Sequence, residues 1–211
     1  EEKGGEFLKA KIALFGQLIC LRMSFRDAIE TFLELNKELL AIGASDQAMA
    51  AGMLSMFSFL NASLPLGTLF EPKLILFQEM ATNLGKKMFV VIFGFIRQFL
   101  YNLQGGSKAS STPTVLDGVA FNEEEVLAKF EGPPKKMNIR DVGTIRLQLA
   151  VIFDDEAVMD EMLDRLDSYP VHDIPIARQH IRMTYVGFAS LILGNKTDKH
   201  KKWADTCMDF F

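Results

Sequence analysis

The chain has 211 residues, of which 49% are hydrophobic and 24% are charged, a composition typical of a globular protein with a substantial core. Its formal net charge of -4 argues against the basic excess of a nucleic-acid-binding protein, so we expect no nucleic-acid partner. The two cysteines, Cys20 and Cys207, lie far apart and lack CxxC or CxxH spacing. This pattern favours buried free thiols in a reducing, cytoplasmic compartment over a disulfide.

The ends of the sequence resemble neither a signal peptide nor a chain start. The first residues, EEKGGEFLKAK, are charged, and the sequence closes on MDFF within an apolar pattern. We therefore expect a fragment of a longer chain. The best candidate for a membrane span, residues 88–103, is short and carries Arg97 and Gln98 near its middle. A buried core helix is favoured there, and a membrane component built around it is the alternative.

Helical spacing begins early in the chain. Within residues 6–21 it is carried by Leu8, Ile12, Phe15 and Ile19. Ser24, with Asp27 three residues later, predicts the N-cap of a second helix that ends at Gly43. Ser45 is expected to cap a third helix over residues 46–60. Small residues there should let a neighbouring helix approach closely: Ala48, Ala50, Ala51 and Gly52.

The next two helices are separated by glycines. Pro72 is expected to open a helix that reaches Leu84 and stops at Gly85, because proline is tolerated in a first turn. Residues 88–104 are apolar nearly all round, so this helix must be covered on several sides. Arg97 is its one strong cation and is expected to reach the rim or pair with a neighbouring helix, a ligand role being the alternative.

Residues 105–121 form a loop of Gly, Ser, Thr and Pro that is long for a compact helical domain. We expect a decorated surface there. The candidates for modification are Ser107, Ser110, Ser111 and Thr112, although a solvated loop has the same composition. Asn122 is expected to cap a short helix over residues 123–130, whose first turn is acidic.

The remaining segments are also helical in pattern. Gly132, Pro133 and Pro134 are expected to close the short helix, and the next helix to begin at Asn138 or Asp141 and run to Phe153. The acidic corner at Asp154, Asp155 and Glu156 starts an amphipathic helix that ends at Tyr169 and Pro170. Pro175 opens a helix reaching Gly194, and residues 199–211 form the last one. Since no period-two run accompanies a hairpin turn, we predict an all-α, antiparallel helix-hairpin array of about ten helices.

Helix pairs recur at roughly forty residues, the range of helical solenoids. Gly16, Ala28 and Phe32 have the spacing of the tetratricopeptide motif, and Ala157 and Ala204 stand where an alanine opens the second helix of a pair. Residues 1–211 are thus interpreted as a single helical-repeat region, a tetratricopeptide-like superhelix (an α-α solenoid). A closed, non-repeating helical domain is the alternative.

Few residues suggest chemistry. His172, His180 and His200 lack metal-ligand spacing, and there is no phosphate-binding glycine loop. Asp154 and Asp155 are adjacent in sequence and do not face each other as an acid–base pair would. We therefore predict no catalytic, cofactor-binding or metal-binding residues. The basic run at residues 196–203, KTDKHKKW, fits contact with phosphate or an acidic partner, or a solvated helix start.

Several segments carry a resemblance to a known family. They are LPLG at 64–67, LYNLQG at 100–105, VLDGVAFNEE at 115–124, LQLA at 147–150 and RMTY at 182–185. Together they resemble the helical region of large multidomain signalling proteins of cyanobacteria and diatoms, from about Ala48 onward. In that family a kinase-like domain or an AAA/STAND-type ATPase accompanies helical repeats. The resemblance implies a region whose catalytic motifs lie elsewhere in the parent protein.

The expected function is a non-catalytic scaffold that mediates protein–protein or interdomain contacts in an ATPase-coupled signal-transduction protein, as the resemblance implies. The expected partner is a protein or a neighbouring domain of the same polypeptide. The alternative is a small-molecule-binding or enzymatic helical domain with Arg97 and His180 lining an internal pocket.

Overall fold

The computed structural model describes residues 6–8, 10–14, 23–62, 64–169, 176–194 and 196–210. Across these ranges the secondary structure is helical, and the only β-type pairing is an isolated antiparallel bridge between Asp117 and Asn122. The prediction of an all-α array of packed neighbouring helices is confirmed. None of the helices in the described ranges combines the length and hydropathy needed to cross a bilayer.

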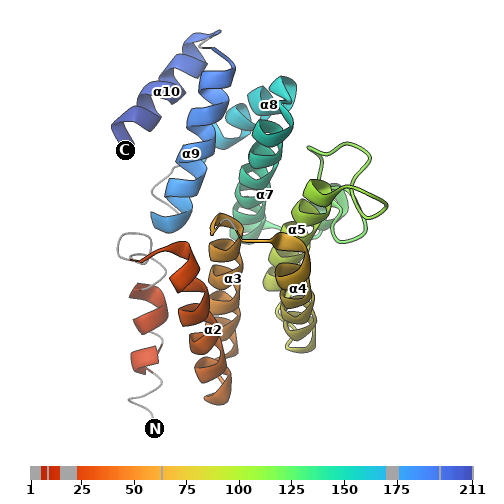
Figure 1. Cartoon of the computed structure of the whole chain (residues 1–211), viewed down its shortest axis with the longest axis vertical. Coiled ribbons are helices and arrows are strands. Elements are labelled where there is room, and N and C mark those ends of the chain that lie inside the picture. The colour runs from red at the N-terminus through yellow and green to blue at the C-terminus, as the bar shows by residue number, and fades with distance from the viewer. Residues whose placement is uncertain are drawn as a thin grey trace. The chain divides into compact units, whose positions relative to one another are not determined.

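The chain divides into two compact units, Glu1–Leu100 and Tyr101–Phe211, which we call the N-terminal and C-terminal units. The N-terminal unit contains α2 (Phe25–Ala41), α3 (Ser45–Asn61), α4 (Leu66–Asn83) and most of α5 (Lys87–Gln104). The C-terminal unit contains the end of α5, then α6 (Glu123–Ala128), α7 (Gly132–Phe153), α8 (Glu156–Asp167), α9 (Ile176–Ile192) and α10 (Asp198–Phe210) (Figure 1).

The hairpin of α2 and α3 begins as the sequence predicts. The Ser24 hydroxyl oxygen accepts a hydrogen bond from the Asp27 amide at 3.2 Å and donates one to the Asp27 carboxylate at 2.7 Å. Ser24 is therefore the N-cap of α2. The second cap prediction is wrong, because α3 starts at Ser45 itself and Ala44 occupies the cap position without a side-chain bond.

Small residues on α3 bring it close to α4. A Cβ atom added to Gly52 would lie 2.6 Å from Cε1 of Phe77, so only glycine permits this approach. The Phe77 ring in turn stacks on Phe93 of α5, with centroids 5.5 Å apart. The predicted close approach is present at Gly52, and it gives α3, α4 and α5 a shared aromatic core.

The predicted start of α4 at Pro72 is wrong. The helix begins at Leu66, with Pro65 as its cap residue, and Pro72 lies inside it. An internal proline costs about 3 kcal/mol because it removes a backbone hydrogen bond. Burial of Phe70 and Leu74 on either side offsets that cost, since each large apolar side chain contributes about 1.5–3 kcal/mol.

Helix α5 is covered on several sides, as its uniformly apolar sequence requires. Its buried apolar side chains are Phe89, Val91, Ile92, Phe93, Phe95, Ile96, Phe99, Leu100 and Tyr101. Arg97, the one strong cation, is only partly buried. Gly105 and Gly106 then adopt positive φ angles of 72° and 84°, which end the helix.

The start of α7 also differs from the prediction. The helix begins at Gly132, with Pro133 and Pro134 in its first turn, so Asn138 and Asp141 lie within it. Prolines fit there because the first amides of a helix have no intrahelical acceptor. The two prolines therefore open a helix, where the sequence analysis used them to close one.

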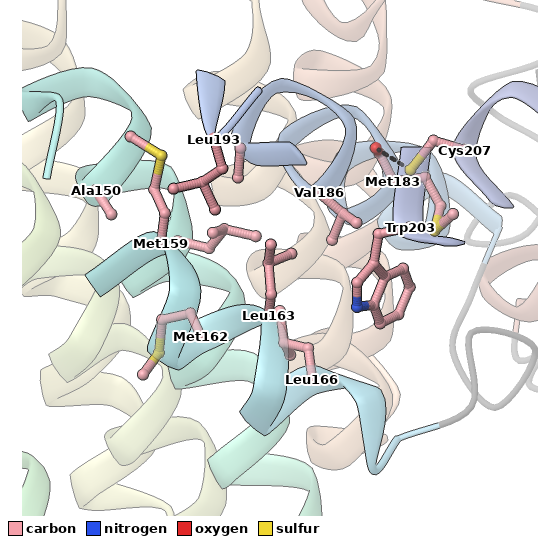
Figure 2. Packing of buried hydrophobic residues seen from close by; sticks show 12 residues of the cluster. Ala150, Met159, Met162, Leu163, Leu166, Met183, Val186, Leu193, Trp203 and Cys207 are labelled. Carbon is pink, nitrogen blue, oxygen red and sulfur yellow. Dashed lines mark hydrogen bonds between the residues drawn. The ribbon is translucent and has the colours of Figure 1, made fainter. Parts of the chain in front are cut away.

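The C-terminal unit is built from two hairpins, α7–α8 and α9–α10, with α9 packed against both α7 and α8. Figure 2 shows the shared core: Met159, Met162, Leu163 and Leu166 of α8, Met183, Val186 and Leu193 of the α9 segment, and Trp203 and Cys207 of α10. Leu163 is fully buried among them. This packing uses one face of α9 and leaves another face exposed.

The repeat interpretation is only partly covered by the structure. Gly16, together with Phe15 and Ile19, lies outside the described residues. Ala28 and Phe32 are buried, whereas Ala157 is exposed and Ala204 is half-buried. The hairpin array is therefore observed, while the tetratricopeptide-like superhelix over residues 1–211 stays a prediction.

Candidate interaction surfaces

The long loop at residues 105–121 is organised by one buried asparagine. Asn102, in the last turn of α5, donates hydrogen bonds from Nδ2 to the carbonyls of Pro113 at 2.9 Å and Val115 at 2.7 Å. Its Oδ1 accepts a bond from the amide of Ser110 at 2.9 Å. A single side chain thus satisfies three backbone groups of the loop, which fixes the loop's path.

The loop is also tied to the α7–α8 hairpin. The Thr114 hydroxyl donates to Oδ2 of Asp155 at 2.8 Å, and Nε of Arg146 donates to the Thr114 carbonyl at 3.2 Å. Of the four hydroxyl residues named as modification candidates, Ser110 is buried, and Ser107, Ser111 and Thr112 are exposed. The predicted decorated surface is therefore a fixed structure with three accessible hydroxyl groups.

Ion pairs extend this attachment to α6. Asn122 caps α6 by accepting a bond from the Glu125 amide at 2.8 Å, as predicted. Oε1 of Glu123 then lies 2.7 Å from Nη1 of Arg165, and its Oε2 lies 3.6 Å from Nη1 of Arg146. These three side chains are largely buried, so the interaction is screened less than a surface pair.

Between the loop and the start of α8 lies a shallow cleft with a volume of about 530 Å³, which we call the corner cleft. It is lined by Thr112, Pro113 and Thr114 on the loop and by Phe153, Asp154, Asp155 and Glu156 at the α7–α8 corner. Phe153 is 41% exposed and its neighbour Ile152 is 49% exposed. Exposed apolar side chains at the end of α7 thus lie next to the carboxylates of the cleft.

The two adjacent aspartates at this corner have separate structural roles. Asp154 ends α7 in the left-handed conformation, with φ of 55°. Asp155 caps α8, because its Oδ1 accepts a bond from the Val158 amide at 3.2 Å. The interpretation of this acidic run as a helix start is confirmed at Asp155.

Helix α9 carries a second candidate surface. Phe188 is 51% exposed, Leu191 is 66% exposed and Ile192 is 39% exposed, and together with Tyr185 we call them the α9 stripe. The rings of Tyr185 and Phe188 pack edge to face, with centroids 6.3 Å apart. The sequence pattern predicted a helix here but not which face is exposed, because α9 is apolar on the buried face as well.

The basic run at residues 196–203 meets acidic partners within the chain. Lys196 pairs with Glu156, Lys199 with Asp160 and Asp164, and Lys202 with Asp167. The hydrogen bond from Lys199, followed by that from His200, lowers the pKa of Asp160. Partial burial acts to lower the pKa of Lys199, but its bonds to Asp160 and Asp164 outweigh this and raise it. The run therefore attaches α10 to α8.

Two of the remaining candidates, His200 and Cys207, have polar partners within the C-terminal unit. Nε2 of His200, which is buried, lies 2.8 Å from Oδ1 of Asp160. The Cys207 thiol donates to the Met183 carbonyl at 3.3 Å (Figure 2), and burial raises its pKa to about 11. Among the described residues, no group of three His, Cys, Asp or Glu side chains is arranged to hold a metal ion. Cys20 and His172 lie outside those residues.

Arg97 and His180 have partners in different units. Nη1 of Arg97 donates to Oε1 of Gln78 at 3.0 Å within the N-terminal unit. The ring of His180 packs against Phe210 in the C-terminal unit, with centroids 5.0 Å apart. An internal pocket lined by both residues stays a prediction.

Arg182, for which the sequence pattern predicted no structural role, is fully buried on α9. Its Nη2 donates to the carbonyls of Leu166 and Tyr169, each at 2.7 Å, so it satisfies the C-terminal end of α8. Burial is the main cause that lowers the pKa of Arg182 to about 10. A basic residue within an apolar helical pattern was the available signal.

Comparison of the chain with protein families, curated protein sequences and solved structures gave no match.

Proposed function

We propose that the chain is a non-catalytic helical scaffold that binds a protein partner or a neighbouring domain through the α9 stripe. The observation that carries this proposal is the exposure of Phe188, Leu191 and Ile192 beside Tyr185, on a helix face without charge. Adjacent exposed apolar side chains on a soluble surface mark sites of contact. Their helical spacing suits a partner helix that lies along α9.

The rigid packing beneath the stripe supports a steric role. Met183, Val186 and Ala189 hold the opposite face of α9 in the core, so the exposed face keeps a fixed shape. A partner then binds without first ordering this helix, which lowers the entropic cost of association. In the fuller form of the proposal, the chain is a region of an ATPase-coupled signal-transduction protein in the cytoplasm, and the contact is made within or by that protein. The sequence resemblance supports that part.

Site-specific photocrosslinking tests the contact. A photoreactive amino acid replaces Phe188 or Leu191 in the full protein expressed in its native cells. We expect a discrete crosslinked protein or interdomain product at either position. The matched control replaces Asp205, an exposed residue on α10. The proposal would be contradicted if neither stripe position gave a crosslinked product, or if position 205 gave the same products.

Charge substitution gives a second readout. Phe188→Asp and Leu191→Asp should remove a product formed through a photoreactive group at position 192, because a buried unpaired carboxylate opposes docking. Since both side chains are more than half exposed, the free energy of unfolding should change by less than about 1 kcal/mol. Met208→Asp, at a residue that is 79% exposed on α10, is the control and should leave the product intact.

A further inference from the structure

We infer that the corner cleft binds a basic, amphipathic segment of a partner protein. This inference rests on the proposed scaffold function and adds a second surface with a stated partner chemistry. The observation that carries the inference is that Phe153, an exposed apolar residue at the end of α7, lines the cleft together with Thr112 and Pro113 of the loop. The acidic side chains around the cleft favour a basic partner segment over an acidic one.

The cleft is held open by bonds that do not depend on a partner. Thr114 is bonded to Asp155 through its hydroxyl and to Arg146 through its carbonyl, which fixes the loop wall against the helix wall. Asn102 fixes the same loop through its hydrogen bond to the Pro113 carbonyl. A preformed cleft of this kind suits a partner segment that orders on binding.

Charge complementarity favours a basic segment. The residues that line the cleft include three carboxylates, Asp154, Asp155 and Glu156, and no Lys or Arg. At the cleft, the side chains of Asp154 and Glu156 are exposed. The field over this corner is therefore negative, and it attracts cationic segments while disfavouring acidic ones.

The pair of Glu156 and Lys196 shows that a carboxylate of the cleft already accepts a cation. Nζ of Lys196 lies 2.5 Å from Oε2 of Glu156, and both side chains are about half exposed, at 54% and 53%. Such an exposed pair is weak, so an incoming cation can replace Lys196. Arginine suits the site best, because its guanidinium can stack on the Phe153 ring while it pairs with a carboxylate.

The test uses the full chain and two fluorescent helical peptides. The first has Leu on one face and Arg on the other, and the second carries Glu in place of Arg. We expect the Arg peptide to bind, with affinity that falls as salt rises from about 50 to about 300 mM. Asp154→Asn with Glu156→Gln should weaken binding about three- to tenfold, and Asn keeps the left-handed backbone at position 154.

Matched variants separate the cleft from general charge. Asp205→Asn with Asp209→Asn removes the same charge from exposed positions on α10 and should leave the affinity unchanged. Phe153→Ser should weaken binding, whereas Met208→Ser should not. No binding of the Arg peptide, equal binding of the Glu peptide, or equal loss in the α10 variants would overturn the inference.

The outcome is independent of the α9 stripe. Phe188→Asp should leave binding of the Arg peptide unchanged, since the inferred site uses other residues. If the peptide fails to bind while the photocrosslinks at positions 188 and 191 persist, the cleft inference is wrong and the scaffold proposal stands. If the crosslinks fail and the peptide still binds at the cleft, the α9 contact is wrong.

Discussion

The two units of the chain are stabilised in different ways. In the N-terminal unit, aromatic side chains meet at short range, as Phe77 and Phe93 do beside Gly52. In the C-terminal unit, an apolar core is supplemented by bonds from side chains to distant backbone groups, as at Asn102 and Arg182. The comparison indicates that close aromatic packing is the main feature of the helical core in the N-terminal unit. The long loop at residues 105–121 in the C-terminal unit also needs specific polar contacts, because its backbone groups have no helical partners.

The largest expected effect is in the N-terminal unit. Phe93 is fully buried and stacks on Phe77, so Phe93→Ala should reduce the free energy of unfolding by about 3–5 kcal/mol through lost burial and a cavity. Urea denaturation followed by far-UV circular dichroism measures this loss. The fluorescence of Trp203, the single tryptophan, reports on the C-terminal unit.

Phe188→Ala is the control for Phe93→Ala, because this ring is 51% exposed. It should cost less than about 1 kcal/mol. Equal losses in the two variants would show that the aromatic cluster does not stabilise the N-terminal unit.

Two buried asparagines allow a direct comparison between the units. Asn102 satisfies three backbone groups of the loop, whereas Asn36 donates one bond, to the Ala48 carbonyl at 2.7 Å. Asn102→Ala should cost about 2–4 kcal/mol and Asn36→Ala about 1–2 kcal/mol, because more buried groups lose partners at position 102. Urea denaturation measures both variants.

Hydrogen exchange sharpens this comparison. In Asn102→Ala the Ser110 amide loses its acceptor and should exchange faster, whereas amides in α3 should keep their protection. An unchanged exchange rate at Ser110 would show that Asn102 does not organise the loop.

The sequence predicted the fold class and most helix ends because these depend on local signals. Ser24 and Asn122 are caps, and Gly43, Gly85 and Gly105 have positive φ angles at helix ends. The helix boundaries predicted from Pro72 and Pro133 were wrong, since a proline can open a helix, lie within it or follow its end. Which of these applies depends on tertiary packing.

The candidate surfaces were less predictable. The loop was recognised from its composition, but its attachment depends on Thr114 and Asp155, which are 41 residues apart in sequence. Likewise, apolar residues on both sides of α9 concealed which face would be exposed. Contacts between distant residues leave no periodic signal in a single sequence.

A smaller effect is expected at the helix contact in the N-terminal unit. In Gly52→Ala the new Cβ would lie 2.6 Å from the Phe77 ring, so the ring must move. Overpacking costs about 1–3 kcal/mol and the better helix propensity of alanine offsets about 1 kcal/mol, so we expect a net loss of up to about 2 kcal/mol. The matched control is Gly187→Ala in the C-terminal unit, where the nearest atom to the new Cβ is 3.5 Å away. That variant should be neutral or slightly stabilising in thermal unfolding, and a loss equal to that of Gly52→Ala would contradict the close-approach argument.

The smallest expected effect concerns the ion pairs between α8 and α10. Because folding lowers the pKa of Asp160 below its ordinary value of 3.8, the Asp160 carboxylate stabilises the folded chain above that value. This contribution is lost as the pH falls through the lowered pKa of the folded state.

The ion pair of Asp160 is largely solvated, so Asp160→Asn should cost less than about 1 kcal/mol at pH 7. Urea denaturation from pH 7 to about pH 3 should show a shallower decline in the variant than in the parent chain. Glu124→Gln, at an exposed carboxylate on α6, is the control and should preserve the parental slope. Equal slopes for Asp160→Asn and the parent would mean that the ion pairs of Asp160 add nothing measurable to the stability of the C-terminal unit.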